Sequence, residues 1–230
     1  MNRESIIENV RRWQQRIDEA SARWGGCEIC AVTKTQDAQT INLAWEAGIR
    51  TIGENRVQEL TGKLDGLDPR YGIHLIGALQ TNKVKYIIPC VDTVQSVDRI
   101  ALAEEISRRA AAADKRMNIL LQVNIARESQ KSGVNEDELM ALVQRCAALP
   151  GVQVRGLMAI MPLVADPEEV RPYFRRMRGW FDRLKEADID NISMDTLSMG
   201  MSGDCIVAAE EGATMVRLGR AIFGARPARI

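Results

Sequence analysis

The chain has a single histidine and no net charge. Its single histidine, His74, excludes a metal centre built on several imidazole ligands. The 31 basic and 31 acidic residues balance to a formal net charge of zero, so the electrostatic footprint of a dedicated nucleic-acid binder is missing. We therefore expect neither a metal site nor a nucleic-acid partner.

Long apolar runs and a disulfide pattern are also missing. No stretch approaches the roughly 18 apolar residues that a membrane helix requires, and the polar segment Met1–Ser5 lacks the apolar core of a secretory signal. Five scattered cysteines, an odd number, argue against a disulfide framework. Cys27 and Cys30 fall in a strand-like run on opposite faces, where we expect both to be buried. These absences predict a cytoplasmic protein without a membrane partner.

After one amphipathic helix, strand-like and helix-like segments alternate to the end of the chain. Residues 2–23 repeat apolar positions every three or four residues, and Gly25 and Gly26 end that helix. The predicted strands cover residues 28–33, 49–53, 73–77, 91–96, 118–124, 153–160, 195–200 and 213–218. The predicted helices between them cover residues 37–47, 55–64, 80–88, 98–113, 135–148, 167–187 and 203–211.

This alternation predicts the fold class. Strands joined through helices pair in parallel through right-handed crossovers, and eight such strands close a barrel. The 230 residues show no linker and no low-complexity tract. We predict one domain over residues 1–230, an α/β protein of the (β/α)8 TIM-barrel type with an extra N-terminal helix.

Polar residues cluster where the predicted strands end, which is where such barrels carry their active sites. Lys34 closes the apolar run of the first strand, whereas Lys63 falls on a predicted helix, where we expect a solvated side chain. A desolvated barrel mouth would disfavour the charged form of Lys34 and free its amine for Schiff-base chemistry. A lysine that merely marks the strand end, with its head in water, is the alternative.

The loops after the last two predicted strands have the composition of a phosphate site. Ser198 and Ser202 supply hydroxyl groups, and Gly200 would let backbone N–H groups approach a ligand closely. Ser202 is a natural N-cap for the helix predicted over 203–211, and Gly219 would add another open backbone donor. A capped turn without a ligand is the alternative interpretation.

Arg217 alternates with apolar neighbours in the eighth predicted strand, so its side chain should point into the barrel mouth. A buried guanidinium needs a partner. Asp195 or Glu54 could be that partner, and a ligand acceptor is the functional alternative. His74 lies in the middle of a strand, where we expect a core histidine whose hydrogen bonds are satisfied.

Short motifs along nearly the whole chain, in order, carry a family resemblance. They are AVTKT (31–35), GEN with VQE (53–55, 57–59), HLIG with LQTNK (74–77, 79–83), QVN (122–124), GLM (156–158), LSMGMS (197–202) with Asp204, and VRLG with IFG (216–219, 222–224). Together they resemble the pyridoxal phosphate homeostasis protein family. The resemblance implies a TIM barrel like the N-terminal domain of alanine racemase, with pyridoxal 5′-phosphate (PLP) bound at its mouth.

The resemblance also assigns roles to individual residues. It implies a Schiff base on Lys34, phosphate binding by Ser198, Met201, Ser202 and Gly219, pocket lining by Asn55, and a contact of Arg217 with the pyridine nitrogen. We also expect Met158 among the cofactor contacts, as a pocket-wall methionine. The chain departs from the family at Gln36-Asp37, Arg56 and Ile73. These departures affect rim contacts and partner surfaces and not the proposed PLP ligands.

The family resemblance implies a carrier and regulator of free PLP that influences vitamin B6 balance. Its partners would be PLP itself and PLP-dependent apo-enzymes, and we expect a monomer or a weak homodimer. A guanidinium at position 217 only donates hydrogen bonds, which leaves the pyridine nitrogen unprotonated and weakens it as an electron sink. The chain also has no length left for the second domain that supplies the opposite acid or base in alanine racemase-like enzymes. We therefore predict no catalytic residue and no turnover.

Two other functions stay open at this point. The first is a weak PLP-dependent racemase or lyase in which Tyr71, His74 or a neighbouring chain supplies the proton. The second is a cofactor-free Schiff-base aldolase that would use Lys34 and the phosphate loops on a phosphorylated sugar.

Overall fold

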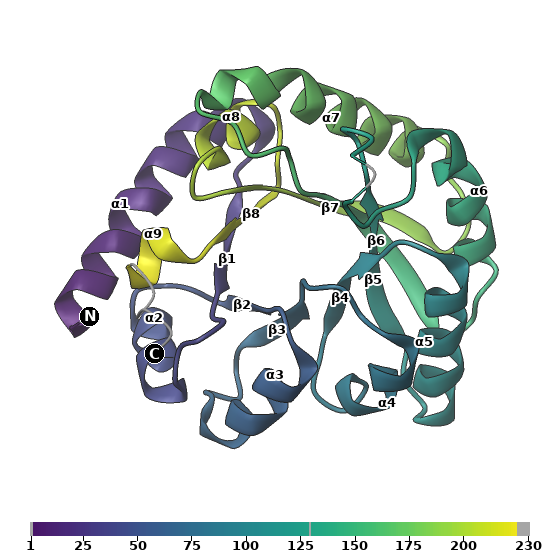
Figure 1. Cartoon of the computed structure of the whole chain (residues 1–230), viewed down its shortest axis with the longest axis horizontal. Coiled ribbons are helices and arrows are strands. Elements are labelled where there is room, and N and C mark those ends of the chain that lie inside the picture. Colours follow the sequence, from purple (N-terminus) through teal and green to yellow (C-terminus); the bar gives the residue numbers. More distant parts are fainter. Residues whose placement is uncertain (1, 129, 225–230) are drawn as a thin grey trace.

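Eight parallel strands form a closed barrel, in the order in which they occur along the chain (Figure 1). The computed structural model describes residues 2–128 and 130–224. The strands are β1 (Glu28–Val32), β2 (Thr51–Glu54), β3 (Gly72–Leu75), β4 (Thr93–Val97), β5 (Met117–Val123), β6 (Val152–Ala159), β7 (Ile192–Met201) and β8 (Met215–Leu218). β8 closes onto β1 with Cys30 opposite Arg217. The predicted fold class is confirmed, while the predicted domain boundary at residue 230 lies outside the described residues.

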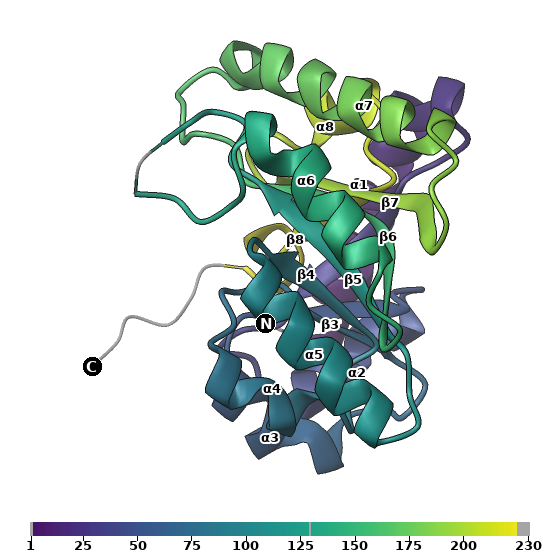
Figure 2. The ribbon, with the colours of Figure 1, turned by 90° about the vertical axis from the view of Figure 1, so that its right-hand side faces the viewer.

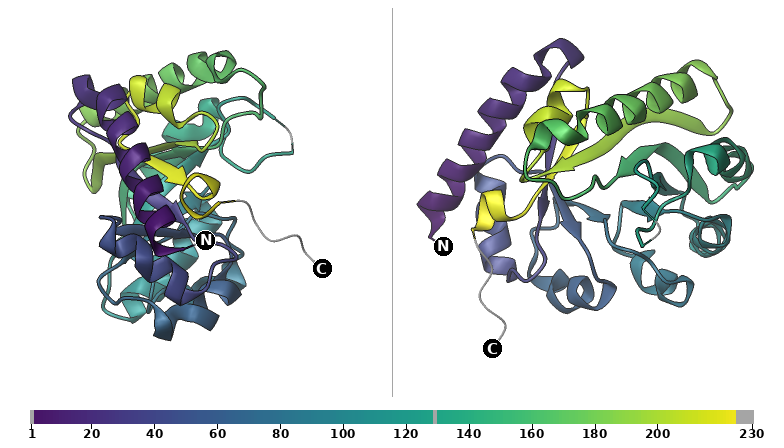
Figure 3. Two further views of the ribbon diagram at one scale, coloured as in Figure 1. Left: turned by 90° about the vertical axis from the view of Figure 1, so that its left-hand side faces the viewer. Right: turned by 45° about the horizontal axis from the view of Figure 1, so that its top comes forward.

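Helices cover the outside of the barrel (Figures 1 and 2). They are α1 (Arg3–Ser21), α2 (Ala38–Glu46), α3 (Val57–Lys63), α4 (Val84–Ile87), α5 (Ile100–Ala112), α6 (Glu136–Ala147), α7 (Arg171–Glu186), α8 (Cys205–Glu210) and α9 (Arg220–Phe223). The extra helix α1 lies against α2, α8 and α9, beside the junction of β8 with β1 (Figure 3). Within the described residues no helix has the length and apolar character needed to cross a membrane.

The first helix shows how local sequence sets the element bounds. Asn2 caps α1 by accepting a hydrogen bond from the N–H of Ser5 (2.9 Å). Ile6 and Ile17 are fully buried against the barrel, and burying such a side chain contributes roughly 1.5–3 kcal/mol. Gly25, with φ of +88°, ends the short 3-10 turn that follows the helix. The predicted helix over residues 2–23 therefore stops where the glycines allow the chain to reverse.

The two faces of the barrel wall differ in chemistry. Outward side chains such as Ile29, Ala31 and Val216 join the large apolar core between strands and helices. Cys30 and Arg217 instead point into the lumen, where they lie close enough for the guanidinium charge to act on the thiol. The polar residues of this lumen form the floor beneath the barrel mouth, and they are described with the site.

Four of the five cysteines, all except the partly buried Cys90, behave as small buried residues. All five are free thiols, and Cys27 and Cys30 are buried, as predicted. Burial raises the pKa of both thiols to about 12. Among the described residues, no group of three or more His, Cys, Asp or Glu side chains is arranged to hold a metal ion.

Element bounds differ from the prediction mainly at short or composite helices. Residues 80–88, predicted as one helix, form a 3-10 turn over Thr81–Lys83 followed by α4. The four-residue helix α9 was not predicted, because a single turn is too short to show helical periodicity. β7 begins at Ile192 instead of residue 195.

Candidate functional site

A cavity of about 290 Å³ opens at the carboxyl ends of the strands. Five of the predicted site residues line it: Lys34, Met201, Ser202, Arg217 and Gly219. They come from the ends of β1, β7 and β8, which adjoin one another in the barrel. The volume lies near the lower limit of the roughly 300–1,000 Å³ that is typical of small-molecule pockets.

Lys34 lies in a tight turn directly after β1. The N–H of Gln36 donates to the carbonyl of Thr33 (3.1 Å), and Thr35 has φ of +67°. This left-handed conformation is rare for a β-branched residue. The turn must therefore be held by contacts with other parts of the chain, and it leaves Lys34 partly buried in the cavity wall.

The loop after β7 forms a second part of the wall. Gly200 has φ of +92°, and a Cβ atom there would lie 2.5 Å from Cβ of Ala208. The residue that precedes α8 is Asp204, whose Oδ1 accepts a hydrogen bond from the N–H of Met201 (2.6 Å). The predicted N-cap role of Ser202 is therefore wrong, because the turn places this residue two positions before Asp204.

The Ser202 side chain instead belongs to the cavity wall. Within residues 2–128 and 130–224 its hydroxyl has no hydrogen-bond partner, so it is available to a ligand. Asp204 lines the same cavity, and burial raises the pKa of its carboxyl group above the ordinary value.

Arg217 is 4% exposed at the floor of the cavity. Its Nη1 donates to the carbonyl oxygen (2.8 Å) and to Oγ (2.7 Å) of Ser198, and its Nη2 donates to the carbonyl of Ala159 (2.7 Å). The prediction that Asp195 or Glu54 pairs with Arg217 is wrong, because these carboxylates pair with Arg155 and Lys63 respectively. Asp195 lies three residues before Ser198 on β7, towards the opposite end of the barrel.

A chain of hydrogen bonds continues from Arg217 across the lumen. Because Ser198 Oγ accepts from Arg217, its proton is directed to Gln95 Oε1 (2.7 Å). The Gln95 amide then donates to Nδ1 of His74 (2.8 Å), so we assign the neutral Nε2–H tautomer to His74. Burial lowers the pKa of His74 to about 4 and that of Arg217 to about 10. At neutral pH the floor thus carries one positive charge, and His74 is the satisfied core histidine that we expected.

Three predicted cofactor residues do not line this cavity. Ser198 and Met158 are fully buried, and Ser198 bonds to Arg217 as part of the floor. Asn55 lines a separate hollow of about 110 Å³ beside α3, and its buried Oδ1 has no partner among the described residues.

Some residues near the site were missed by the sequence reasoning. The apolar segment 161–165 after β6 lines the cavity, with Leu163 97% exposed. Lys63 was expected in solvent, yet its side chain is only 10% exposed and its Nζ lies 2.5 Å from Glu54 Oε1. The spacing of Glu59 and Lys63, one helical turn apart, was the available signal for an ion pair.

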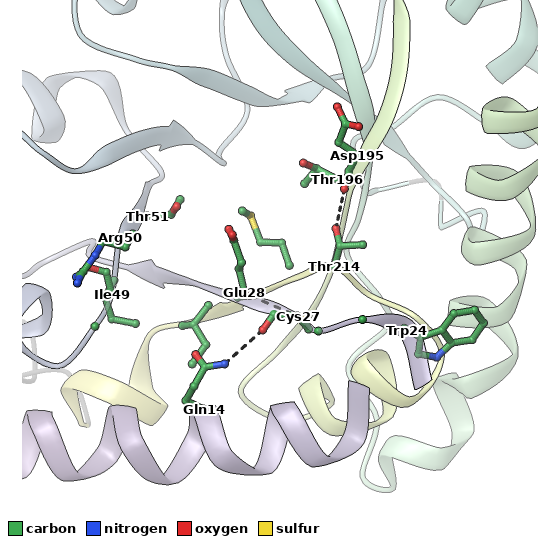
Figure 4. Close-up of a pocket in the computed structure, with 15 residues that line it drawn as sticks. Gln14, Trp24, Cys27, Glu28, Ile49, Arg50, Thr51, Asp195, Thr196 and Thr214 are labelled. Atoms are coloured by element: carbon green, nitrogen blue, oxygen red, sulfur yellow. Dashed lines mark hydrogen bonds between the residues drawn. The ribbon is translucent and has the colours of Figure 1, made fainter. Parts of the chain in front are cut away.

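A larger cavity, about 640 Å³, lies at the opposite end of the barrel (Figure 4). Its wall includes Gln14 of α1, Asp195 within β7, and three residues at or just before the starts of β1, β2 and β8: Glu28, Arg50 and Thr214. None of the predicted site residues lines it.

Comparison with protein families and curated relatives gives one consistent result. Residues 1–227 match the family described as alanine racemase, N-terminal domain. The chain is 42% identical over 227 residues to the pyridoxal phosphate homeostasis protein of Aquifex aeolicus, covering 96% of this chain and 99% of the relative. The protein of the same name from Pseudomonas aeruginosa is 40% identical over 228 residues, with 96% of each chain covered.

Solved structures of similar proteins include one with PLP bound. PipY of Synechococcus elongatus, solved with PLP bound, has a TM-score of 0.84 and 33% identity, covering 95% of this chain and all (100%) of that chain. A protein from Bifidobacterium adolescentis has a TM-score of 0.90 and 38% identity, covering 96% and 95%. Alanine racemase from Corynebacterium glutamicum, at 15% identity, a TM-score of 0.69 and coverage of 96% of this chain and 60% of that chain, shares the fold.

Proposed function

This chain belongs to the pyridoxal phosphate homeostasis protein family, and from that premise we propose that it binds PLP at the barrel mouth and acts in PLP homeostasis as a carrier and regulator. The observation that carries the proposal is the meeting of Lys34, Ser202, Arg217 and Gly219 around one cavity. A primary amine, a hydroxyl without a partner and a buried cation are the groups that an aldehyde and a phosphate require.

The residues present fit PLP in charge as well as in chemistry. Lys34 contributes the amine of the wall, Arg220 adds positive charge for a dianionic phosphate, and Arg217 would face the pyridine nitrogen. Asp204 is the carboxylate of this wall, and its Oδ1 already accepts from a backbone N–H. The helical start at Gly219 adds no side chain that would obstruct a ligand.

We assign separate tasks to the residues of the mouth. The amine of Lys34 would condense with the aldehyde of PLP and release one water molecule, which is the chemistry that the bound group supplies. Ser202 and Gly219 would hold the phosphate, and Met201 would contribute to the wall. Ser198 would act from below the cavity by orienting Arg217, and Met158 would support the same floor.

The surroundings of the site favour holding PLP over turning over an amino acid. Arg217 can only donate hydrogen bonds, so it cannot give the pyridine nitrogen the proton that strengthens an electron sink. His74 is neutral above pH 4 and bonds to Gln95 in the lumen. The hydroxyl of Tyr71 donates to the carbonyl of Ile41 (2.8 Å), within the outer core, and is not placed to serve a racemase or lyase.

Reversible attachment at Lys34 suits delivery to PLP-dependent apo-enzymes, which we propose as the recipients. A monomer or weak homodimer in the cytoplasm stays a prediction. An exposed apolar segment at the rim, with Leu163 at its tip, would be available to such recipients.

Borohydride trapping tests the proposed attachment site. The protein is loaded with PLP, reduced, digested and mapped by mass spectrometry, and we expect a pyridoxyl adduct on Lys34. The Lys34→Ala variant should lose the adduct, whereas Lys185→Ala, at an exposed position of α7, should keep it. An adduct confined to another lysine would contradict the assignment.

Two further measurements separate the other functions. Incubating the PLP-loaded protein with single-enantiomer amino acids in deuterated water should give no steady exchange at Cα. Exchange that disappears in Lys34→Ala would favour a racemase or lyase. A colourless protein that traps a sugar phosphate on Lys34 would favour the aldolase.

A further inference from the structure

Lys63, at the end of α3, contacts the loop that carries Lys34. Its side chain is 10% exposed, and its Nζ lies 2.5 Å from Glu54 Oε1 and 3.3 Å from Glu59 Oε1. Glu54 is fully buried at the end of β2. A buried ammonium and a buried carboxylate persist only when each is paired and hydrogen-bonded. We call Glu54, Glu59 and Lys63 the Lys63 cluster.

The ammonium group of this cluster binds the backbone on both sides of Lys34. Lys63 Nζ donates to the carbonyl of Thr33 (2.9 Å) and to the carbonyl of Gln36 (3.2 Å). A lysine has three donors and no acceptor, so these two carbonyls and the carboxylates take up its hydrogen-bonding capacity. The ammonium thus joins the residue before Lys34 to the loop after it.

The two carboxylates of the cluster also accept hydrogen bonds from the same loop, at groups that Lys63 does not contact. Glu54 Oε1 accepts from the hydroxyl of Thr33, and Glu59 Oε1 accepts from the N–H of Thr35. Thr35 has φ of +67°, a conformation that a β-branched side chain rarely adopts without external support. The cluster provides that support, with Lys34 between the bound residues.

The Lys63 cluster does not line the cavity that Lys34 lines. Its residues belong to the end of β2 and to α3, and α3 lies on the outside of the barrel wall (Figure 1). Ser202 and Gly219 belong to other elements, after β7 and β8, so the cluster can influence a ligand only through the loop of Lys34.

We propose that Lys63 is a positioning residue for the attachment of PLP, because its bonds to Thr33 and Gln36 hold the loop in the conformation that presents the Lys34 amine to the cavity. This inference rests on the proposed function, in which Lys34 condenses with the aldehyde. Removing the Lys63 charge would release the loop and impair the condensation. Binding of the ring and phosphate would persist, because their ligands lie elsewhere.

Two variants remove the charge in different ways. Lys63→Met keeps the length of the stem, and Lys63→Met combined with Glu54→Gln leaves no buried carboxylate without its cation. Lys185→Met is the matched control, because Lys185 is exposed on α7. Each protein is titrated with PLP and with pyridoxine 5′-phosphate, which has the same ring and phosphate but an alcohol in place of the aldehyde.

We expect both Lys63 variants to react with PLP about 10- to 100-fold more slowly or weakly, because a small misplacement of a reacting group has effects of this size. The dissociation constant for pyridoxine 5′-phosphate should stay within about twofold of the wild-type value, since its ligands lie on other elements. Lys63→Arg, which keeps the charge and donors, should restore part of the PLP reaction. The pH midpoint of the visible absorbance band of the bound PLP should shift in Lys63→Met and not in Lys185→Met.

Equal losses of both ligands in the double variant would show that Lys63 only maintains the fold, and would overturn the proposal. Unchanged reaction with PLP in both Lys63 variants would overturn it as well. Failure of the proposed function has a different signature. In that case the wild-type protein forms no borohydride-stable adduct on Lys34, and Lys34→Ala binds PLP as the wild type does.

Discussion

At the amino-terminal end of the barrel a cavity of about 640 Å³ opens between α1 and the strands, whereas the cavity at the mouth measures about 290 Å³. The wall of the larger one includes Asp195, which pairs with Arg155 (2.8 Å), and Arg50, which donates to the carbonyl of Trp45 (3.0 Å). The smaller one combines the amine of Lys34, the hydroxyl of Ser202 and the buried guanidinium of Arg217. Convergence of complementary groups, and not volume, is the reason why we propose the mouth as the binding site.

The two ends also differ in how their backbone turns are built. At the mouth, Gly200 and Thr35 have positive φ; Gly200 is enclosed by neighbouring atoms, and the exposed Thr35 is held through its N–H, which donates to Glu59 Oε1. At the other end, Gly26 also has positive φ, but the space around it is open. Gly200 and Gly26 therefore form a pair in which an enclosed positive-φ glycine at the mouth can be compared with an open one at the other end.

Replacing one glycine at each end should give the largest difference in the free energy of unfolding and in PLP binding. Gly200→Ala adds a Cβ atom 2.5 Å from Cβ of Ala208 at φ of +92°, and we expect a loss of about 3 kcal/mol in the free energy of unfolding together with weaker PLP binding. Gly26→Ala meets no atom within 4 Å, and its positive φ alone should cost about 1 kcal/mol with PLP binding retained. Urea denaturation and PLP titration measure both. Equal losses of stability would remove the distinction between the two ends.

Lowering the pH should decrease the free energy of unfolding, because His74 is buried in its neutral form in the floor of the mouth. Its pKa in the folded protein is about 4, below the value of about 6.5 for an unfolded chain. Between these values the unfolded state binds more protons, so the free energy of unfolding should fall by roughly 2–3 kcal/mol from pH 6.5 to pH 4. This contribution becomes constant above about pH 7.5, roughly one unit above the unfolded pKa, where His74 is neutral in both states.

The control for that prediction is His74→Gln, which removes the only histidine of the sequence. Urea denaturation at several pH values between 4 and 6.5 gives the difference between wild type and variant. That difference isolates His74 from the carboxyl groups, which titrate in both proteins. An identical pH dependence in the two proteins would contradict the assigned pKa.

Removing the ion pair at the amino-terminal end should have the smallest effect on the free energy of unfolding. Asp195 and Arg155 are both substantially exposed, with side chains 49% and 40% accessible, and exposed pairs contribute about 0–1 kcal/mol. Asp195→Asn should therefore lower the free energy of unfolding by less than about 1 kcal/mol and leave PLP binding unchanged. A marked loss of PLP binding would mean that the two ends are coupled.

Residue patterns predicted which side of each strand a residue occupies, but not its height in the barrel. Ser198 and Ser202 both looked like phosphate ligands, yet they lie four positions apart along and beyond β7, where the chain rises about 3.3 Å per residue. Ser202 reaches the cavity wall, and Ser198 stays below it, bonded to Arg217. Lys63 was misjudged for a related reason, since helical periodicity does not reveal which carbonyl groups face the helix.

The sequence by itself determined the alternation of strands and helices, and with it the barrel, because side-chain periodicity and the rules of parallel pairing act locally and between neighbours. It also predicted Lys34, Ser202, Arg217 and Gly219 at the mouth, because the carboxyl ends of parallel strands lie at one end of a barrel. Only the tertiary structure decided that Arg217 bonds to Ser198 and that Lys63 holds the Lys34 loop. These contacts join residues far apart in the chain, and their geometry depends on how the barrel closes and how α3 packs against it.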